Sequence, residues 1–321
     1  MGQKKKSLQE KKISVVIPVY NESEHIFNSI EYVKTILKNA GIRYEFVLVD
    51  DGSKDSSWSE LKKMAEADTG ITAVRLSRNF GKEPALCAGL DAATGDAVIV
   101  MDADLQHPPE LIPKMVRIWH EEGYDVVEGV KSSRGKEGIF YKMCAGLFYN
   151  VLDKVTGISF KDASDFKLLD RKVVDAWKQL PEKMPFFRGM SAWVGFERKT
   201  IYFEVQERVE GTSKWSLKHL ATLAVTAITS YTSAPLHAIT LFGMIMFILS
   251  VVLGIHTIVM KLLGYALGGF TTVILLQLLI GSMIMISLGI IGIYLMKIYH
   301  EIKGRPRYLV SVCIKEGEEQ E

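Results

Sequence analysis

The sequence is poor in cysteine and carries almost no net charge. Its three cysteines, Cys87, Cys144 and Cys313, lie far apart and form no C-x-x-C pair, which argues against a disulfide framework and a structural zinc site and favours a reducing compartment. Its 39 basic residues nearly balance its 37 acidic ones, for a net charge of +2, so no global field indicates nucleic acid as a partner. Any cationic binding surface must therefore be local.

Two nucleotide-binding motifs are also missing. Pro18, Tyr20 and Asn21 follow the first apolar run, where a dinucleotide-binding domain needs G-x-G-x-x-G. The sequence contains no G-x-x-x-x-G-K-[ST] loop of a P-loop NTPase either. The basic stretch MGQKKKSLQEKK is not followed by an apolar segment with a cleavage site, so we expect that this end is not sent through a membrane.

Long apolar runs are present near the other end of the chain. Pro235 to Met260 and Leu262 to Met296 contain no Asp, Glu, Lys or Arg, and only Lys261 lies between them. Each run exceeds the roughly 20 residues that a helix needs to cross a bilayer, which predicts spans at about 236–260 and 270–296. A pair of buried core helices is the alternative, but it would require helices that are apolar on every face.

The charges beside these runs predict the orientation. The basic residues flanking the outer ends are Lys214, Lys218, His219, Lys297, Lys303, Arg305 and Arg307. This bias places both termini in the cytoplasm and a short loop outside, as in a multi-pass protein of the cytoplasmic (inner) membrane. The expected parts are a cytoplasmic catalytic domain at 1–210, an interfacial amphipathic segment at 211–234, two transmembrane helices at 235–297 and a cytoplasmic C-terminal tail at 298–321. A plain connecting helix would suit the interfacial segment equally well.

Five apolar, β-branched runs lie in the first part of the chain, with helical stretches between them. They begin at residues 13, 44, 71, 96 and 125. Strands that are apolar on both faces and alternate with helices predict an α/β domain with a mostly parallel sheet. Ligands bind at the carboxyl ends of such strands. Polar segments follow the first four runs there, namely PVYNE, DDGSKDSS, SRNFGKE and DADLQHPPE.

The segment with the most specific motif contains Asp102 and Asp104. Two carboxylates at i and i+2 on a loop can converge on one hard cation, and Mg²⁺ or Mn²⁺ held in this way can bridge a diphosphate. The alternative is a cluster that caps the helix opened by Pro108 and Pro109.

Other polar side chains at the strand ends have two interpretations each. Asp50 and Asp51 can accept hydrogen bonds from the imide of a base or from a ribose hydroxyl, or they can cap the turn before a helix from Ser56. The remaining residues either contact the nucleotide or only cap and solvate their segments. They are Pro18, Tyr20, Asn21 and Glu22 before a helix expected from Glu22 to Asn39, and Arg78 and Lys82 after the third run.

The order of the motifs resembles a known family. VVIPVYNE, VDDGSKD, NFGKE, MDADLQHPPE, SDFKLLDR and ERVEGTSKW are similar to the polyprenyl-phosphate sugar transferases of glycosyltransferase family 2, such as dolichol-phosphate mannose synthase and bacterial undecaprenyl-phosphate glucosyltransferases. The resemblance runs from about 13 to 308 and includes the RPRY segment. It implies a Rossmann-like GT-A fold, inverting transfer from a nucleotide sugar to polyprenyl phosphate, and Mg²⁺ or Mn²⁺. GTSKW replaces the Q-x-x-R-W of processive synthases, which disfavours a polymerase.

The resemblance also implies roles for individual residues. Pro18, Tyr20, Glu22, Asp51 and Asp102 would bind the nucleotide, together with Asp50 and Lys82 from the strand-end pattern. Asp102, Asp104 and Gln106 would bind the metal. Arg208, Ser213 and Lys214 would belong to a loop that closes over the donor. Arg134 and Lys142 would meet the acceptor phosphate, although solvated surface charge is the default for Lys142. Arg188 is a further cation that could hold the acceptor, because arginine suits phosphate oxygens.

Asp165 resembles the general base of relatives. A hydrogen bond to a neighbouring loop or to Arg188 is the structural alternative, and a lipid phosphate, which is largely ionised at neutral pH, needs orientation more than deprotonation. UDP-glucose is the first expectation for the donor, ahead of UDP-GlcNAc, UDP-galactose, GDP-mannose or a UDP-aminoarabinose derivative.

A non-catalytic, lipid-presenting membrane subunit is the competing class of function, and it predicts decay of the metal and acceptor residues. The glycines in the apolar runs also allow a homo-oligomer. They are Gly243, Gly254, Gly281, Gly289 and Gly292.

Overall fold

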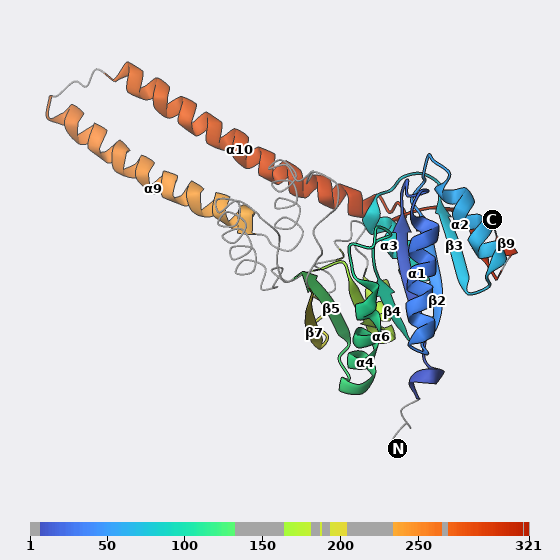
Figure 1. Cartoon of the computed structure of the whole chain (residues 1–321). Coiled ribbons are helices and arrows are strands. Elements are labelled where there is room, and N and C mark those ends of the chain that lie inside the picture. Colours follow the sequence, from blue (N-terminus) through green and yellow to red (C-terminus); the bar gives the residue numbers. More distant parts are fainter. Residues whose placement is uncertain are drawn as a thin grey trace. The chain divides into compact units, whose positions relative to one another are not determined.

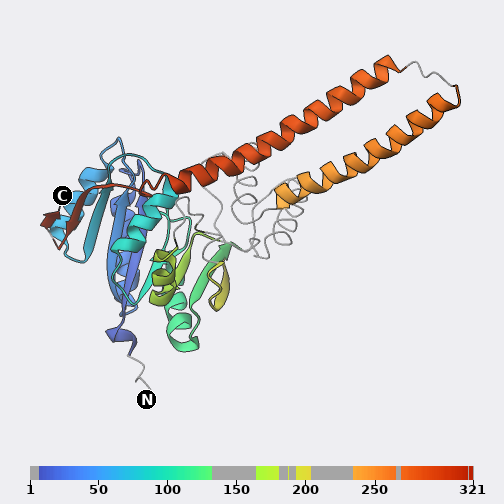
Figure 2. The same cartoon turned by 180° about the vertical axis from the view of Figure 1, so that it is seen from behind.

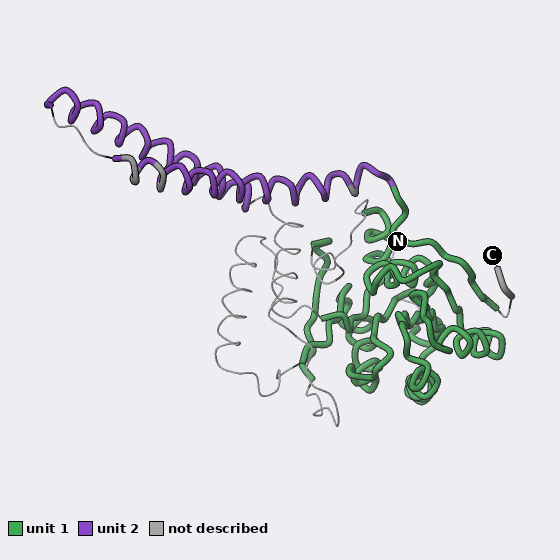
Figure 3. Tube along the Cα trace, turned by 90° about the horizontal axis from the view of Figure 1, so that it is seen from above, with its two compact units in different colours: residues 1–153, 158–213, 305–321 green, residues 154–157, 214–304 purple. Residues whose placement is uncertain are grey.

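The chain divides into two compact units (Figure 3). The computed structural model describes residues 7–131, 164–180, 187, 193–203, 234–264, 269–316 and 318–320. Unit 1 comprises Met1–Asp153, Ile158–Ser213 and Arg305–Glu321, and unit 2 comprises Lys154–Gly157 and Lys214–Gly304. The last 17 residues, 305–321, therefore belong to the same unit as the first part of the chain.

The described part of unit 1 is built on a nine-stranded sheet with the order β7-β5-β6-β4-β1-β2-β3-β8-β9 (Figure 1). The strands are β1 Lys12–Val19, β2 Arg43–Asp50, β3 Ile71–Leu76, β4 Ala97–Val100, β5 Val126–Lys131, β6 Lys167–Asp170, β7 Arg198–Phe203, β8 Val310–Lys315 and β9 Glu318–Gln320. The neighbours β4, β1, β2 and β3 are parallel, whereas β6 and β8 pair antiparallel with β4 and β3. The predicted α/β class with its parallel core is confirmed, and the five predicted runs are β1 to β5.

Helices cover both faces of this sheet. The α-helices are α1 Ile26–Asn39, α2 Ser57–Ala67, α3 Lys82–Ala92, α4 Ile112–Arg117 and α6 Arg171–Lys178, and the shorter helical turns are η1 Leu8–Glu10, η2 Pro109–Leu111 and η3 Ile118–Glu122. Helices α1, α2 and α4 lie on one face (Figure 1), and α3 and α6 lie on the other (Figure 2). The expected start of α1 at Glu22 is wrong, because the Glu22 carbonyl accepts the amides of both His25 and Ile26 and so closes a turn before the helix.

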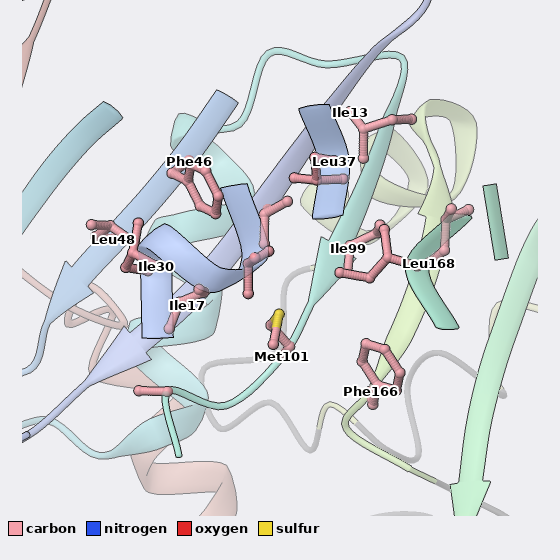
Figure 4. Close-up of a cluster of buried hydrophobic side chains, with 14 of the residues drawn as sticks. Ile13, Ile17, Ile30, Leu37, Phe46, Leu48, Ile99, Met101, Phe166 and Leu168 are labelled. Carbon is pink, nitrogen blue, oxygen red and sulfur yellow. The ribbon is translucent and has the colours of Figure 1, made fainter. Parts of the chain in front are cut away.

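The core explains why β1 is apolar on both faces. Ile13 and Ile17 point toward α1 and pack with Ile30 and Leu37 (Figure 4). On the other face, α3 approaches so closely that a Cβ at Gly89 would collide with the Val16 side chain. This close packing fixes α3 against the central strands and thereby holds its first residue at the carboxyl edge of the sheet.

The segment that follows the second apolar run returns to the sheet as β8, which closes the outer edge of β3. The Tyr308 hydroxyl donates to Asp91 Oδ2 at 2.7 Å, and the Arg307 guanidinium donates to the Leu180 carbonyl. The C-terminal segment is therefore an integral part of unit 1, which its description as a tail did not anticipate.

Unit 2 contains two long helices in its described part. They are α9 Ala234–Leu262 and α10 Phe270–Ile302. Their apolar spans, Pro235–Leu262 and Leu276–Tyr299, have mean hydropathies of 2.6 and 2.3, and no described residue in the most apolar window of either is buried. At about 1.5 Å per residue both exceed a ~30 Å hydrocarbon layer, so both could span a membrane by length and composition. The expected interfacial segment, 211–234, lies almost entirely outside the described residues.

Candidate active site

The strand order contains a switch point beside β1, at the carboxyl edge of the parallel strands. The chain runs outward from β1 through β2 to β3 and then crosses back to place β4 on the other side of β1. Such a switch point is where open α/β sheets bind ligands. Because β6 runs antiparallel beside β4, with Val100 opposite Lys167, the residues just before β6 also lie at this carboxyl edge. This topology brings Asp165 close to Asp102, although 62 residues separate them in the sequence.

Lys82 links these two aspartates. Its Nζ lies 2.6 Å from Asp102 Oδ1 and 2.9 Å from Asp165 Oδ2, and the Asp165 side chain is only 10% exposed. Burial by itself lowers the pKa of Lys82, but the two carboxylates outweigh burial and raise this pKa above its ordinary value. The structure thus joins the predicted metal loop to the predicted base through one ammonium group.

The loop after β4 does not cap the following helix. The turn η2 begins after Pro108 without any side-chain cap, so the capping alternative for the two aspartates is not what the structure shows. Instead, Asp104 Oδ1 accepts the Gln106 amide at 3.0 Å, and Leu105 adopts a left-handed φ of 52°. This conformation costs a leucine roughly 1–2 kcal/mol, and strain of this kind is concentrated at functional loops.

The donor atoms of this loop suit a hard divalent cation. Among the residues that the structure describes, no three His, Cys, Asp or Glu side chains form a metal-binding group. Two carboxylates and an amide are nevertheless sufficient, since Mg²⁺ commonly takes one or two carboxylates together with substrate phosphates. The pKa of Glu22 is raised, first by burial and then by Asp104; His25 opposes this, and Asp55 and Asp102 add smaller increases. Several carboxylates therefore face one region, which favours a cation there.

The two aspartates after β2 have different partners. Asp50 is fully buried, and its Oδ1 accepts the Ser53 amide at 3.2 Å. Its Oδ2 lies 3.4 Å from Arg75 Nε but has no hydrogen-bond partner. Burial raises the pKa of Asp50. The turn interpretation therefore holds for one oxygen of Asp50, while the other faces the Arg75 guanidinium without a hydrogen bond.

Asp51 instead fastens the loop that carries Lys82. Its two oxygens accept the amides of Phe80 and Gly81 at 2.7 and 2.9 Å, and burial raises its pKa. Gly52 makes this approach possible, because it has a φ of +66° and a Cβ there would lie 2.5 Å from the carbonyl carbon of Arg78. Asp51 thus holds the backbone from which α3 begins.

The segment after β1 is tied to the same region. Asn21 has a φ of 54° and its Oδ1 accepts the Lys54 amide at 2.9 Å, while the Glu22 amide donates to Ser57 Oγ at 2.8 Å. Helix α1 has no side-chain cap, so Glu22 does not serve as one. Pro18 lies within β1 opposite Val49. Tyr20 at the end of this strand is 42% exposed.

His107 was not recognised as a site residue in the sequence. It is 93% buried, stacks on Phe166 with ring centroids 5.1 Å apart, and meets Phe203 edge-on at 6.5 Å. Burial is the main cause that lowers its pKa. Within the described ranges, the buried side-chain polar atoms without a hydrogen-bond partner are Asp50 Oδ2, His107 Nδ1 and Trp177 Nε1. Two of the three belong to segments at this edge, which is typical of a ligand site. In the sequence, only the position of His107 within DADLQHPPE could have indicated that it lies at the site.

The remaining predicted site residues lie outside the described part of the chain. They are Arg134, Lys142, Arg188, Arg208, Ser213 and Lys214. Phe187, the residue before Arg188, is described, and its backbone amide donates to Glu83 Oε2 at 2.7 Å. Glu83, the residue after Lys82, therefore contacts Phe187, which directly precedes Arg188 in the sequence.

Comparison with known proteins identifies the family. The profile described as glycosyl transferase family 2 matches residues 14–177. An uncharacterized glycosyltransferase of Synechocystis sp. is 42% identical over 304 residues, covering 93% of this chain and 94% of that protein. A bactoprenol glucosyl transferase of Shigella phage SfX is 36% identical over 302 residues, covering 94% and 99%.

A solved structure is also similar. Glucosyl-3-phosphoglycerate synthase from Mycobacterium tuberculosis, in complex with Mn²⁺, UDP and its product, is 22% identical with a TM-score of 0.48, covering 68% of this chain and 78% of that one. The family match covers β1 from residue 14 onward and the whole of β2 to β6, including the loops after β1, β2, β3 and β4 that carry the site. The chain belongs to glycosyl transferase family 2.

Proposed function

We propose that this protein transfers a sugar, with inversion, from a nucleotide diphosphate to the phosphate of a polyprenyl lipid at the cytoplasmic face of a membrane. The observation that carries the proposal is the group of Asp102, Lys82 and Asp165, which unites donor-side and acceptor-side carboxylates at one edge. Similarity to relatives named bactoprenol glucosyl transferases over 94% of the chain supports a polyprenyl acceptor. The same names favour UDP-glucose among the possible donors.

On the donor side, Asp102, Asp104 and Gln106 hold Mg²⁺ or Mn²⁺. When bound, the cation supplies positive charge against the diphosphate that leaves. Asp50 Oδ2, which lacks a hydrogen-bond partner, accepts a base imide or a ribose hydroxyl, and the exposed ring of Tyr20 lies against the base. Asp51 acts indirectly, because both of its oxygens already hold the Phe80–Gly81 backbone.

On the acceptor side, Asp165 orients the lipid phosphate or removes its residual proton. Arg134, Lys142 and Arg188 bind the phosphate oxygens, because guanidinium and ammonium groups suit them. Arg208, Ser213 and Lys214 close over the donor. The displaced diphosphate and the incoming phosphate are both anionic, so cations on both sides reduce their repulsion.

The pairing of β8 with β3 supports a membrane hairpin. The chain leaves unit 1 before α9 and re-enters it after α10, so two crossings place both outer ends on one side. The basic flanks assign that side to the cytoplasm. We expect a cysteine at Leu263, between the helices, to react with a membrane-impermeant maleimide in intact cells, and one at Lys303 to react only after permeabilisation. Equal labelling of the two positions would contradict the hairpin.

A transfer assay tests the function directly. The full-length protein in detergent is incubated with polyprenyl phosphate, Mg²⁺ or Mn²⁺, and a panel of UDP- and GDP-sugars. The mass of the lipid product is then measured by mass spectrometry. We expect a gain of one sugar residue with one donor, and most strongly with UDP-glucose. Absence of any glycosylated lipid across the whole panel would favour the non-catalytic, lipid-presenting alternative.

Replacement of Asp165 by asparagine separates the two acceptor-side roles. We expect turnover to fall by about 10² to 10⁴, the usual contribution of acid–base catalysis, and we expect little change in donor binding. Asp175→Asn is the matched control, because Asp175 is a half-exposed aspartate of α6 that lies 3.9 Å from Arg171. If Asp165→Asn keeps most of its turnover, the acceptor reacts already ionised and Asp165 only orients it.

A further inference from the structure

Lys82 occupies a position that a lysine does not favour by itself. It is the first residue of α3, directly after the N-cap Gly81, where the positive end of the helix dipole disfavours a cation. The carboxylates of Asp102 and Asp165, at 2.6 and 2.9 Å, compensate for this repulsion. The ammonium group is therefore held by these two carboxylates rather than by its own helix.

One of these carboxylates belongs to the proposed metal loop. Lys82 Nζ contacts Asp102 Oδ1, so a divalent cation bound to the same side chain would lie close to the ammonium group. Two cations a few ångströms apart repel each other by several kcal/mol even at an effective dielectric constant of about 20. Metal binding and the Lys82–Asp102 ion pair therefore oppose each other.

The side chain of Lys82 can leave Asp102 without a change in its backbone. Asp51 holds the amides of Phe80 and Gly81, which fixes the start of α3. The Lys82 side chain is 40% exposed and has a flexible four-carbon stem with three rotatable donors. Asp165 remains a partner after Asp102 is released, and an anionic diphosphate bound at this edge would offer another.

We propose that Lys82 is a place-holding cation that makes metal binding depend on the donor. Without donor it neutralises Asp102 and weakens binding of a divalent cation. A nucleoside diphosphate attracts the ammonium group away from Asp102, so metal and diphosphate bind cooperatively, and each increases the affinity of the other by the same factor. This inference rests on the proposed function, because it assumes a donor that carries a diphosphate.

Binding of Mn²⁺ to the full-length protein, followed by electron paramagnetic resonance without turnover, tests this role. In the wild type we expect weak binding of Mn²⁺ alone and at least tenfold tighter binding with UDP, with GDP as a parallel arm. In Lys82→Met we expect Mn²⁺ alone to bind at least tenfold more tightly than in the wild type, and we expect most of the effect of UDP to disappear.

Two further variants serve as controls. Lys82→Arg keeps the charge and should retain weak donor-free binding. Lys63→Met changes the net charge equally at an α2 lysine that pairs with Glu60 and should behave as the wild type. Lys82→Gln replaces Lys82→Met if circular dichroism shows that the latter is unfolded. Unchanged or weaker donor-free Mn²⁺ binding in the neutral variant overturns the proposal.

The outcome is separable from that of the transfer assay. Sugar transfer without the shift in Mn²⁺ affinity removes only the place-holding role of Lys82. The shift in affinity without transfer to polyprenyl phosphate removes only the proposed acceptor.

Discussion

The Asp104→Ala variant is expected to lose sugar transfer by about a thousandfold while it stays folded and membrane-bound. The Asp104 side chain is exposed and accepts a hydrogen bond from the nearby Gln106 amide, so its removal costs the fold about 1 kcal/mol. It also removes one of the two carboxylates proposed to hold the metal. A thousandfold loss corresponds to about 4 kcal/mol of transition-state stabilisation, within the several kcal/mol that a bound metal supplies.

Steady-state turnover across a Mn²⁺ titration measures this effect, with thermal unfolding as the check on folding. Glu60→Gln is the control, because Glu60 is a surface carboxylate of α2 paired with Lys63. Partial recovery at high Mn²⁺ would support weakened metal binding as the cause. Unchanged turnover in Asp104→Ala would reject the metal assignment.

The Lys167→Met variant is expected to be destabilised by about 3–5 kcal/mol. Lys167 Nζ lies 3.1 Å from Glu128 Oε1, and the two side chains are 0% and 5% exposed. They face each other across the pairing of β5 with β6, and Lys167 also lies 4.9 Å from the Phe187 ring. Removing the lysine leaves the Glu128 charge buried without this partner, and breaking a buried pair in this way costs that amount.

The double variant Lys167→Met/Glu128→Leu is expected to recover most of this loss, because replacing both members of a buried pair by apolar residues is often close to neutral. Thermal unfolding of the full-length protein in detergent distinguishes the variants, since each kcal/mol shifts the Tm of a unit of this size by roughly 2–4 °C. If the double variant is as unstable as Lys167→Met, the buried glutamate is not the cause. Lys167 is the first residue of β6 and follows Asp165 by two residues. Turnover of a stable double variant therefore also reports whether the Lys167–Glu128 pair positions Asp165.

The central strands and the position of the site could be predicted from the sequence. Runs such as ISVVIPV are apolar on both faces because helices cover both sides of β1, and this pattern is among the strongest in a sequence. Parallel strands end at a common edge, so the placement of Asp51 and Asp102 at that edge followed from the order of the runs. The structure confirms these strands, and it places Asp51 just after β2 and Asp102 just after β4.

The partners of the site residues could not be predicted in the same way. Strand β6 has only four residues, and its antiparallel position beside β4, which brings Asp165 to Lys82, depends on contacts distant in the sequence. Lys82 had no local feature that separated a bridging role from a surface role. Likewise, no local pattern showed that the chain returns after the second apolar helix to pair β8 with β3.

A structure of the full-length protein with Mn²⁺ and UDP, in which the metal is located by its anomalous diffraction, tests the central claim most directly. We expect one strong peak at metal–ligand distance from carboxylate oxygens of Asp102 and Asp104, in contact with the diphosphate, with Lys82 Nζ no longer on Asp102. A peak that lies away from both aspartates while UDP is bound would contradict it.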